Sequence, residues 1–438
     1  MDWSSYCSIV SQSSSLPLKK PLVYFGSAHP MKPHRLKLTH HLILNYGLHK
    51  HLDCYSPKPV DPGVMSEYFH DEEYVQFLRK ITPDNGRQHA ANIQRFNVGG
   101  TADCPVFEGL FEFNQITSGA SIDGAAQLCL DMYDIAVNWS GGFHHAHKAE
   151  AAGFCYINDI VLAIVELLKV HARVLYIDID VHHGDGVEEA FYTSDRVMTF
   201  SLHKYGDFFP GTGSNREKGA KAGDGYSLNC PLNNGISDEK YFDQLFKPIF
   251  DKVMEVFQPS AIVLQCGADS LAADRLGTLN LTTKGHARMV EYVKSKSVPL
   301  LVLGGGGYTI RNVARVWCYE TAVLVDKPDI CDDIPYHDYY EYFAPTYKLH
   351  LKPENMTDLN SKSDIDNIRT DLLQQLKGLR GAPSVGMHQV PPLFHRMEEK
   401  DAEKDQEEDL HEDVRPPKKK RGRKSKKQHE AELYDGVD

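Results

Sequence analysis

The chain has 438 residues, of which 41% are hydrophobic and 25% charged, and its formal net charge is −12. No stretch approaches the roughly 18 consecutive apolar residues of a membrane span, and the N-terminal segment lacks a secretory signal pattern. The nine cysteines are scattered without a CxxC pair. This distribution argues against a disulfide framework or a zinc finger and predicts a soluble intracellular protein with no membrane partner.

The N-terminal residues 1–19 are rich in serine and show no periodicity, which predicts a disordered leader. A folded catalytic domain is expected over 20–392. In it, short apolar runs that predict strands alternate with longer segments, such as 157–170, of helical periodicity. The runs cover residues 22–25, 135–139, 174–179, 197–202, 261–266 and 299–304. Continuous apolar strands indicate a sheet covered on both faces, so we expect a single three-layer α/β domain with a mostly parallel central sheet.

The composition changes after about residue 392. Residues 398–413 carry ten acidic side chains, and 415–427 carry nine Lys or Arg among thirteen residues. Neither block can form a core, so the tail 393–438 is predicted to be disordered. A solubilising tail is one interpretation, but the dense basic block with its proline pair favours a nuclear-import signal. The block also resembles a minor-groove DNA-binding motif, with Lys424 where proline is usual, so weak DNA contact is a further hypothesis.

Chemically active side chains follow the predicted strands at their carboxyl ends, where sites form in open α/β sheets. In chain order they are His144 and His145, then Asp178, Asp180, His182 and Asp185, then His203, Asp269 and Tyr308. Five strand ends that converge in this way predict one polar site. Taken alone, His147 and His203 are interpreted as structural histidines.

Two carboxylates and one imidazole of this set predict a metal site. Asp180 and His182 are two residues apart in an extended segment, so their side chains point the same way. Asp269 would supply a third ligand and leave a position open for water, which is typical of catalytic zinc. The alternative, a surface acid paired with a histidine, is disfavoured because the preceding apolar run places these residues at the edge of a buried sheet.

The remaining residues predict how a proton could move. His144 and His145 are candidates for a general base, and Asp178 and Asp185 can each orient one imidazole. Tyr308 follows four glycines and can donate its hydroxyl to a developing oxyanion. Together these residues predict metal-assisted hydrolysis of an acyl bond without a covalent intermediate.

Long segments around these residues resemble the class I zinc-dependent histone deacetylases of the arginase/deacetylase superfamily. The segments are 138–163, 176–206, 208–213, 264–277 and 303–317, within a likeness that extends from about Leu22 to about Val390. The resemblance implies an arginase/deacetylase-like fold with a central eight-stranded parallel sheet. It also implies zinc-dependent hydrolysis of N6-acetyl-lysine in histone tails and other proteins, with release of acetate. The expected setting is transcriptional repression in the nucleus with a corepressor scaffold protein, and a cytoplasmic pool is a further expectation.

The resemblance also assigns roles to single residues. It makes Asp180, His182 and Asp269 the zinc ligands, His145 backed by Asp185 the general base, His144 backed by Asp178 its electrostatic partner, and Tyr308 the group that polarises the acetyl carbonyl. Asp103 would hold the substrate backbone, and the acyl-lysine tube would be lined by Gly153, Phe154, Phe209 and Leu276. A structural K⁺ is implied at Asp178, Asp180, His182, Ser201 and the Leu202 carbonyl. Inositol polyphosphate, a regulator, would contact Lys32, Arg275 and Arg311.

Three departures from the family pattern concern the rim of the site. Segment 96–107 is two residues longer than usual, the loop in 22–35 is shorter, and His147 stands where Lys is common, which we interpret as surface variation. Two other hypotheses remain: the same chemistry on a small substrate such as an acetylated polyamine, and a catalytically inactive scaffold. Asp103 and the basic tail disfavour the first, and the complete catalytic set disfavours the second.

Overall fold

The computed structural model describes residues 24–100, 103–379 and 382–383, together with the backbone of residues 7–10. Its centre is a parallel eight-stranded sheet of order β2-β1-β3-β8-β7-β4-β5-β6. The strands are β1 (Cys7–Val10), β2 (Asp53–Tyr55), β3 (Ile135–Asn138), β4 (Val174–Asp178), β5 (Val197–Lys204), β6 (Ser227–Leu232), β7 (Ala261–Gln265) and β8 (Leu300–Leu303). Strands β3 to β8 form its contiguous centre, and β1 and β2 extend one edge. The predicted α/β domain with a parallel central sheet is confirmed.

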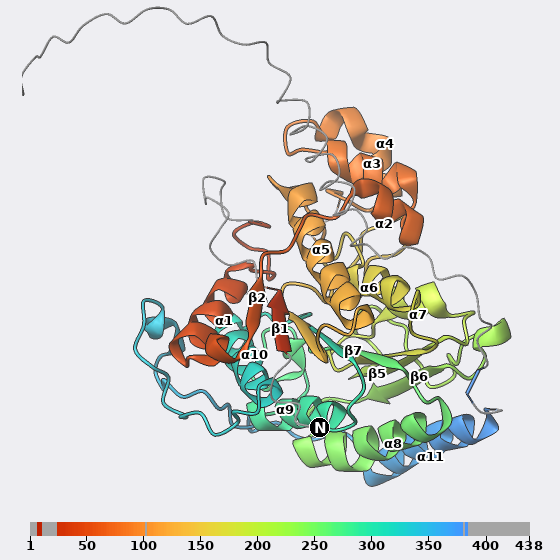
Figure 1. Cartoon of the computed structure of the whole chain (residues 1–438), viewed down its shortest axis with the longest axis vertical. Helices are drawn as coiled ribbons and strands as arrows, with labels where there is room; N and C mark the ends of the chain where they lie inside the picture. Colours follow the sequence, from red (N-terminus) through yellow and green to blue (C-terminus); the bar gives the residue numbers. More distant parts are fainter. Residues whose placement is uncertain (1–6, 11–23, 101–102, 380–381, 384–438) are drawn as a thin grey trace, which may run out of the picture. The chain divides into compact units, whose positions relative to one another are not determined.

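Helices cover both faces of the sheet (Figure 1). They are α1 (His34–Asn45), α2 (Pro62–Tyr68), α3 (Glu72–Lys80), α4 (Ala90–Arg95), α5 (Leu110–Cys129), α6 (Asp159–Leu167), α7 (Asp185–Phe191), α8 (Lys247–Val256), α9 (Thr283–Lys294), α10 (Ile310–Leu324) and α11 (Lys362–Gly378). Shorter helical turns are η1 (Leu48–His51), η2 (Gly86–His89), η3 (Lys221–Gly223), the π-helical η4 (Lys240–Phe246), η5 (Ala268–Ser270) and η6 (Tyr340–Phe343). Among the described residues, no helix combines the length and apolar character that crossing a membrane requires.

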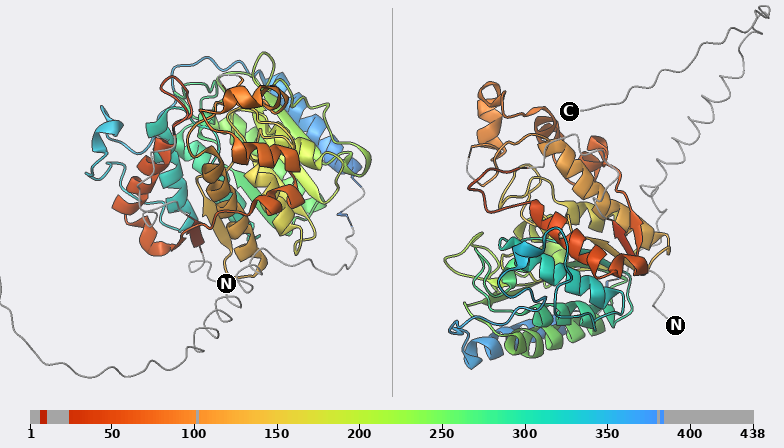
Figure 2. Two further views of the ribbon diagram at one scale, coloured as in Figure 1. Left: turned by 90° about the horizontal axis from the view of Figure 1, so that it is seen from above. Right: turned by 90° about the vertical axis from the view of Figure 1, so that its left-hand side faces the viewer.

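Alternate residues of each central strand enter two different apolar layers. On β4, Leu175 and Ile177 pack with α8, α9, α10 and α11, whereas Val174 and Tyr176 pack with α5, α6 and α7. Both sets are buried, which is why the strand reads as a continuous apolar run. The right-hand view of Figure 2 shows α2, α3 and α4 beyond one end of the sheet.

Two expectations about the N-terminal region are wrong. Residues 7–10 are expected in a disordered leader, yet they form β1, which pairs in parallel with β2 and β3. Four residues beside a serine-rich stretch carry little local signal for a strand. Their pairing depends on strands that are distant in the sequence. Tyr24 and Phe25 form no strand, because Phe25 packs its ring against Phe107 instead, at 4.5 Å. The rest of 1–19, residues 22–23 and the tail 393–438 lie outside the described residues.

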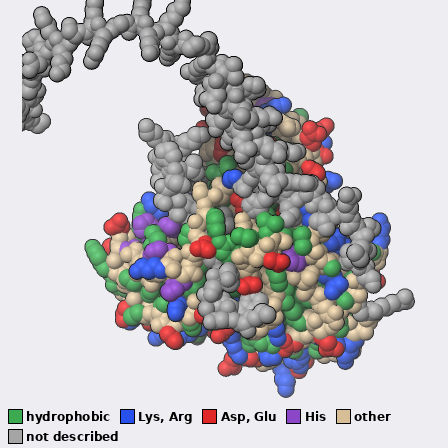
Figure 3. Space-filling model, viewed as in Figure 1, with side chains coloured by type: hydrophobic (Ala, Val, Ile, Leu, Met, Phe, Trp, Pro, Cys, Tyr) green, Lys and Arg blue, Asp and Glu red, His purple; other side chains and the backbone are tan. Residues whose placement is uncertain are grey.

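Histidine side chains gather on the surface over α1 (Figure 3). His34, His40 and His41 lie on α1, and the ring of His41 stacks against that of His337 at 6.3 Å. Among the described residues, however, the one group of three His, Cys, Asp or Glu side chains close enough to hold a metal is elsewhere.

Candidate active site

The predicted metal ligands meet at the carboxyl ends of β4 and β7. The Nδ1 atom of His182 lies 3.0 Å from Oδ1 of Asp180 and 3.2 Å from Oδ2 of Asp269. All three side chains are buried, and one atom of each lies within 4.8 Å of the others. The extended segment after β4 therefore brings Asp180 and His182 to one point, as their spacing predicts.

This group fits a divalent cation. Oδ2 of Asp269 is buried and has no hydrogen-bond partner, which is costly for a carboxylate oxygen. Burial and the nearby Asp180 carboxylate raise the pKa of Asp269. Burial disfavours a charged His182, but the two carboxylates outweigh it and raise its pKa to about 10. The site thus attracts positive charge, and its donor set of two carboxylates and one imidazole suits Zn²⁺.

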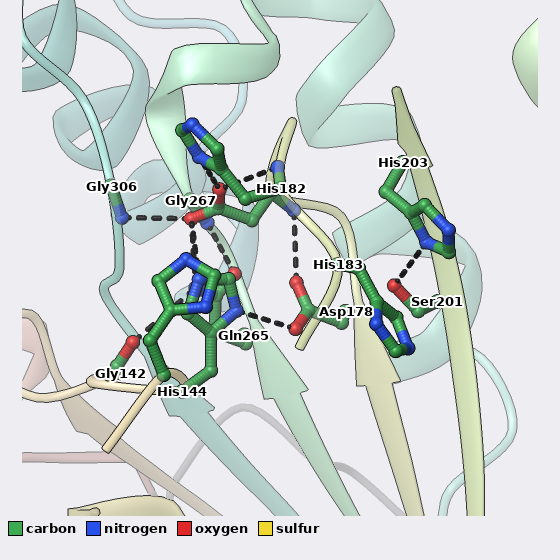
Figure 4. A network of polar contacts seen from close by, with 12 residues as sticks. Gly142, His144, Asp178, His182, His183, Ser201, His203, Gln265, Gly267 and Gly306 are labelled. Carbon is green, nitrogen blue, oxygen red and sulfur yellow. Dashed lines mark hydrogen bonds and ion pairs between the residues drawn. The ribbon is translucent and has the colours of Figure 1, made fainter. Parts of the chain in front are cut away.

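The second carboxylate oxygens are held by the protein itself. Oδ2 of Asp180 accepts hydrogen bonds from the Gln265 side chain (2.9 Å) and the Gly306 amide (2.8 Å), and Oδ1 of Asp269 accepts one from the Val181 amide (2.9 Å). Gln265 at the end of β7 and Gly306 in the glycine-rich loop are labelled in Figure 4. Gln265 was not among the predicted site residues, and its one signal in the sequence is a polar residue inside an apolar run.

The two adjacent histidines each bond a different carboxylate. Nδ1 of His144 donates to Asp178 (2.8 Å), and Nδ1 of His145 donates to Asp185 (2.7 Å). Asp178 is in turn held by the Tyr176 hydroxyl (2.6 Å). Each Nδ1–H bond fixes the tautomer, so that Nε2 of His145 is the ring nitrogen left to accept a proton.

The electrostatics distinguish the two imidazoles. Burial opposes a charge on His144, but Asp178 and Asp180 outweigh it and raise the pKa of His144 to about 9. Burial and the neighbouring His144 charge lower the pKa of His145 to about 3. At neutral pH, His144 is therefore the cation of the pair and His145 the neutral imidazole.

The loop that carries the histidines is fixed by buried residues on α6 and before α3. Asp159 accepts hydrogen bonds from the amides of Gly142 and Phe143, and the Asn158 side chain donates to the Ala146 carbonyl. His70 then accepts the Asn158 amide on Nε2 and donates from Nδ1 to the Lys148 carbonyl. This support spans distant parts of the chain and gives no local sequence signal.

A buried ion pair lies behind the Asp269 loop. His286 on α9 donates from Nδ1 to Glu320 on α10 (2.5 Å) and from Nε2 to the Gly267 carbonyl (3.1 Å). Both side chains are fully buried. The Trp317 indole donates to the neighbouring Cys266 carbonyl (2.8 Å). Two helices therefore fix the backbone from which Asp269 projects.

Tyr308 lies opposite the histidine pair, 6.4 Å from His182 between ring centroids. Its amide donates to Asp274 (2.8 Å). The buried Arg35 guanidinium donates to the carbonyls of Gly305 (2.6 Å) and Gly307 (2.8 Å). Arg35 has no local signal in the sequence, since it lies in the first turn of an ordinary amphipathic helix. A small pocket beside the site is lined by Tyr308, both adjacent histidines, Gly153 and Gly306, among others.

The residues predicted to line the acyl-lysine tube lie around this pocket, the entrance to the site. Phe209 is half-exposed and contacts His145 at 4.9 Å between ring centroids, and Phe154 contacts Tyr308 at 5.7 Å. Gly153 lies between His145 and Phe209, because a Cβ there would come within 2.5 Å of one and 2.8 Å of the other. Leu276 packs in the same apolar cluster as Phe154. Asp103 is exposed at the rim, and its carbonyl is 3.1 Å from Nε2 of His29.

Other predicted residues lie beside the group of metal ligands. His203 bonds Ser201 (2.8 Å) and the Gly213 carbonyl (2.8 Å), so it is structural. Figure 4 shows Ser201 and His203 on the strand next to His183, away from His182. The Leu202 carbonyl accepts the Tyr241 hydroxyl (3.1 Å).

The three predicted phosphate-binding cations differ in their surroundings. Lys32 donates to the carbonyls of Gly26 (2.8 Å) and Ser27 (2.9 Å). Arg275 and Arg311 are exposed. The Asp274 carboxylate accepts the amides of Leu276, Gly277, Tyr308 and Thr309. Asp274 therefore joins the Arg275 segment to the start of α10.

His147, interpreted from the sequence as surface variation, is partly buried beside the site. Its side chain is only 20% exposed and lies between Glu189, 2.5 Å from Nδ1, and Asp185, 3.5 Å from Nε2. The contact arises because α7 begins at Asp185, directly beside the loop that carries His147.

The fold and this site define an α/β enzyme with a candidate catalytic metal centre. A model of the histone deacetylase domain matches residues 29–324. Histone deacetylase 1 of Homo sapiens is 58% identical over 368 residues, which cover 84% of this chain and 75% of that protein. Histone deacetylase 6 of Arabidopsis thaliana is 56% identical over 381 residues (86% of this chain, 80% of that protein), and histone deacetylase HDAC1 of Drosophila melanogaster 55% over 368 (84% and 70%).

The chain belongs to the histone deacetylase family. The matched region lies within the predicted catalytic domain, 20–392. The resemblance to class I enzymes, stated above from the motifs, is thereby confirmed.

Proposed function

We propose that this protein is a zinc-dependent deacetylase that hydrolyses N6-acetyl-lysine in histones and represses transcription in a nuclear corepressor complex. The observation that supports it most is the buried convergence of Asp180, His182 and Asp269 beside a neutral His145. A scaffold without activity would have no need to keep two buried carboxylates, Asp180 and Asp269, beside each other, which costs stability.

Asp180, His182 and Asp269 would hold the zinc ion. When bound, it would polarise the acetyl carbonyl and activate a water molecule. His145 would accept a proton from the attacking water on Nε2, since Asp185 holds its Nδ1–H. His144, charged and paired with Asp178, stabilises negative charge and can supply a proton to the departing lysine amine. Tyr308 donates its hydroxyl to the oxyanion.

The entrance fits an acetylated lysine. Acetylation removes the charge of the lysine amine, so the whole stem is compatible with the aromatic walls of Phe154 and Phe209. Asp103 would accept backbone amides of a peptide at the rim, which a free acetylated polyamine lacks. A K⁺ ion would be held by Ser201, the Leu202 carbonyl, Asp178, Asp180 and His182.

The basic segment 415–427 would direct nuclear import and make weak contact with DNA. A further part of the protein would remain in the cytoplasm.

The test measures acetate released from an acetyl-lysine histone H3 peptide by the full chain. We expect release that a chelator abolishes and zinc restores, and much weaker release from N-acetylated spermidine. Release of acetate from N-acetylated spermidine but not from the peptide would favour the small-substrate alternative. Inactivity on both substrates, with and without a corepressor fragment, would favour a scaffold.

We also propose that inositol polyphosphate bridges Lys32, Arg275 and Arg311 to a basic corepressor domain. Exposed arginines suit phosphate oxygens, and Asp274 is occupied by four backbone amides. Inositol hexakisphosphate should stimulate the complex with a corepressor fragment. An Arg275→Ala, Arg311→Ala double variant should not respond; equal stimulation of both proteins would contradict the proposal.

A further inference from the structure

Asp185 and Glu189 place two like charges one turn apart at the start of α7. Carboxylates at positions i and i+4 of a helix repel each other. His147 projects from the preceding histidine loop between them, with Nδ1 2.5 Å from Glu189 and Nε2 3.5 Å from Asp185. Nδ1 donates its hydrogen to Glu189, and a second hydrogen on Nε2 would face Asp185, so this position favours an imidazolium.

The pKa of His147 agrees with this geometry. Its contact with Asp185 raises that pKa to about 9, with Glu189 adding to the effect against burial. The ring is therefore charged at neutral pH.

Asp185 is shared between two histidines. Its Oδ1 accepts Nδ1–H of His145 (2.7 Å) and the Gly186 amide (3.0 Å), and its Oδ2 faces His147. Asp185 and His147 therefore connect the buried His145 to Glu189, which lies at the surface and is 66% exposed. Without His147, Oδ2 would lose its cation, and the carboxylate would be held through Oδ1 alone.

We propose that His147 is a positioning residue for the His145–Asp185 pair: by bridging Asp185 and Glu189 it keeps Oδ1 of Asp185 on the imidazole that accepts the proton. This inference rests on the proposed deacetylase function. It concerns the chemical step and not substrate binding, since His147 lies on the side of Asp185 away from His145.

The test compares His147→Gln, which is neutral, with His147→Lys, which keeps a cation that can reach both carboxylates. Loss of a hydrogen bond to a charged group predicts that His147→Gln lowers kcat by about tenfold with KM within about twofold. His147→Lys should restore most of kcat. Lys148→Gln removes an exposed charge from the next position of the same loop and should leave kcat unchanged. Thermal unfolding of each variant separates a loss of fold from a loss of positioning.

Two results would overturn the proposal: an unchanged kcat in His147→Gln, or a kcat in His147→Lys as low as in His147→Gln. If His147→Gln does not fold, His147→Lys is compared with wild type. A kcat of His147→Lys that is about tenfold below that of wild type would then overturn the proposal. An inactive wild type that folds normally would instead contradict the proposed function, so the two failures are distinguishable.

Discussion

His70 should make the stability of this protein depend on pH in a way that one substitution removes. The ring is 1% exposed, donates from Nδ1 to the Lys148 carbonyl (3.1 Å) and accepts the Asn158 amide on Nε2 (3.0 Å). Protonation would place a second N–H against the Asn158 amide and break that bond. Burial lowers the pKa of His70 from 6.5 to about 4.

The sign follows from proton linkage. Between pH 6.5 and 4 the unfolded chain binds a proton at this residue and the folded protein does not, so the free energy of unfolding falls as the pH falls. A shift from 6.5 to about 4, at about 1.4 kcal/mol per pH unit, amounts to about 3 kcal/mol. This contribution is fully present above pH 6.5.

The assay is urea unfolding of wild type and His70→Gln at several pH values from 7.5 to 4.5. Glutamine can donate and accept but does not titrate, so the wild type should lose stability relative to His70→Gln as the pH falls. Equal slopes with pH in both proteins would refute the reasoning.

Two further predictions concern catalysis and the tail. Tyr308→Phe removes one hydroxyl that acts mainly in the transition state, so kcat should fall by ~10²–10³ with little change in KM; steady-state kinetics on an acetyl-lysine peptide check this, and an effect on KM alone would mean that the hydroxyl serves binding. Deletion of residues 415–427 should move a fluorescently tagged protein toward the cytoplasm while peptide deacetylation stays unchanged, and an unaltered nuclear distribution would assign that segment another role.

The residues at the centre of the site were predictable because their signals are local. Asp180 and His182 follow a continuous apolar run at a spacing of two, and the carboxyl ends of parallel strands meet at one edge of a sheet. Asp269 and Tyr308 follow other strands in the same way. The five central strands that were predicted agree with the structure to within one residue at either end, apart from β5, which extends two residues further, to Lys204.

The supports of the site were not predictable because their partners are distant in the chain. His70 and Asn158 are 88 residues apart, and His286 and Glu320 are 34 apart on two different helices. A buried histidine on a helix has no local feature that distinguishes it from a surface one. Likewise, β1 is a strand because β2 and β3 pair with it, and four residues carry too little periodicity to show this.

The central claim is that the buried Asp180, His182 and Asp269 hold the catalytic zinc. It is tested most directly by measuring zinc content and deacetylase activity together in Asp269→Asn, with Asp274→Asn, which lies outside the metal group, as a matched control for metal content. We expect Asp269→Asn to lose most of its zinc and its activity while its thermal unfolding and circular dichroism show an intact fold, and Asp274→Asn to retain zinc. A folded Asp269→Asn that keeps one zinc per chain and full activity would contradict the assignment.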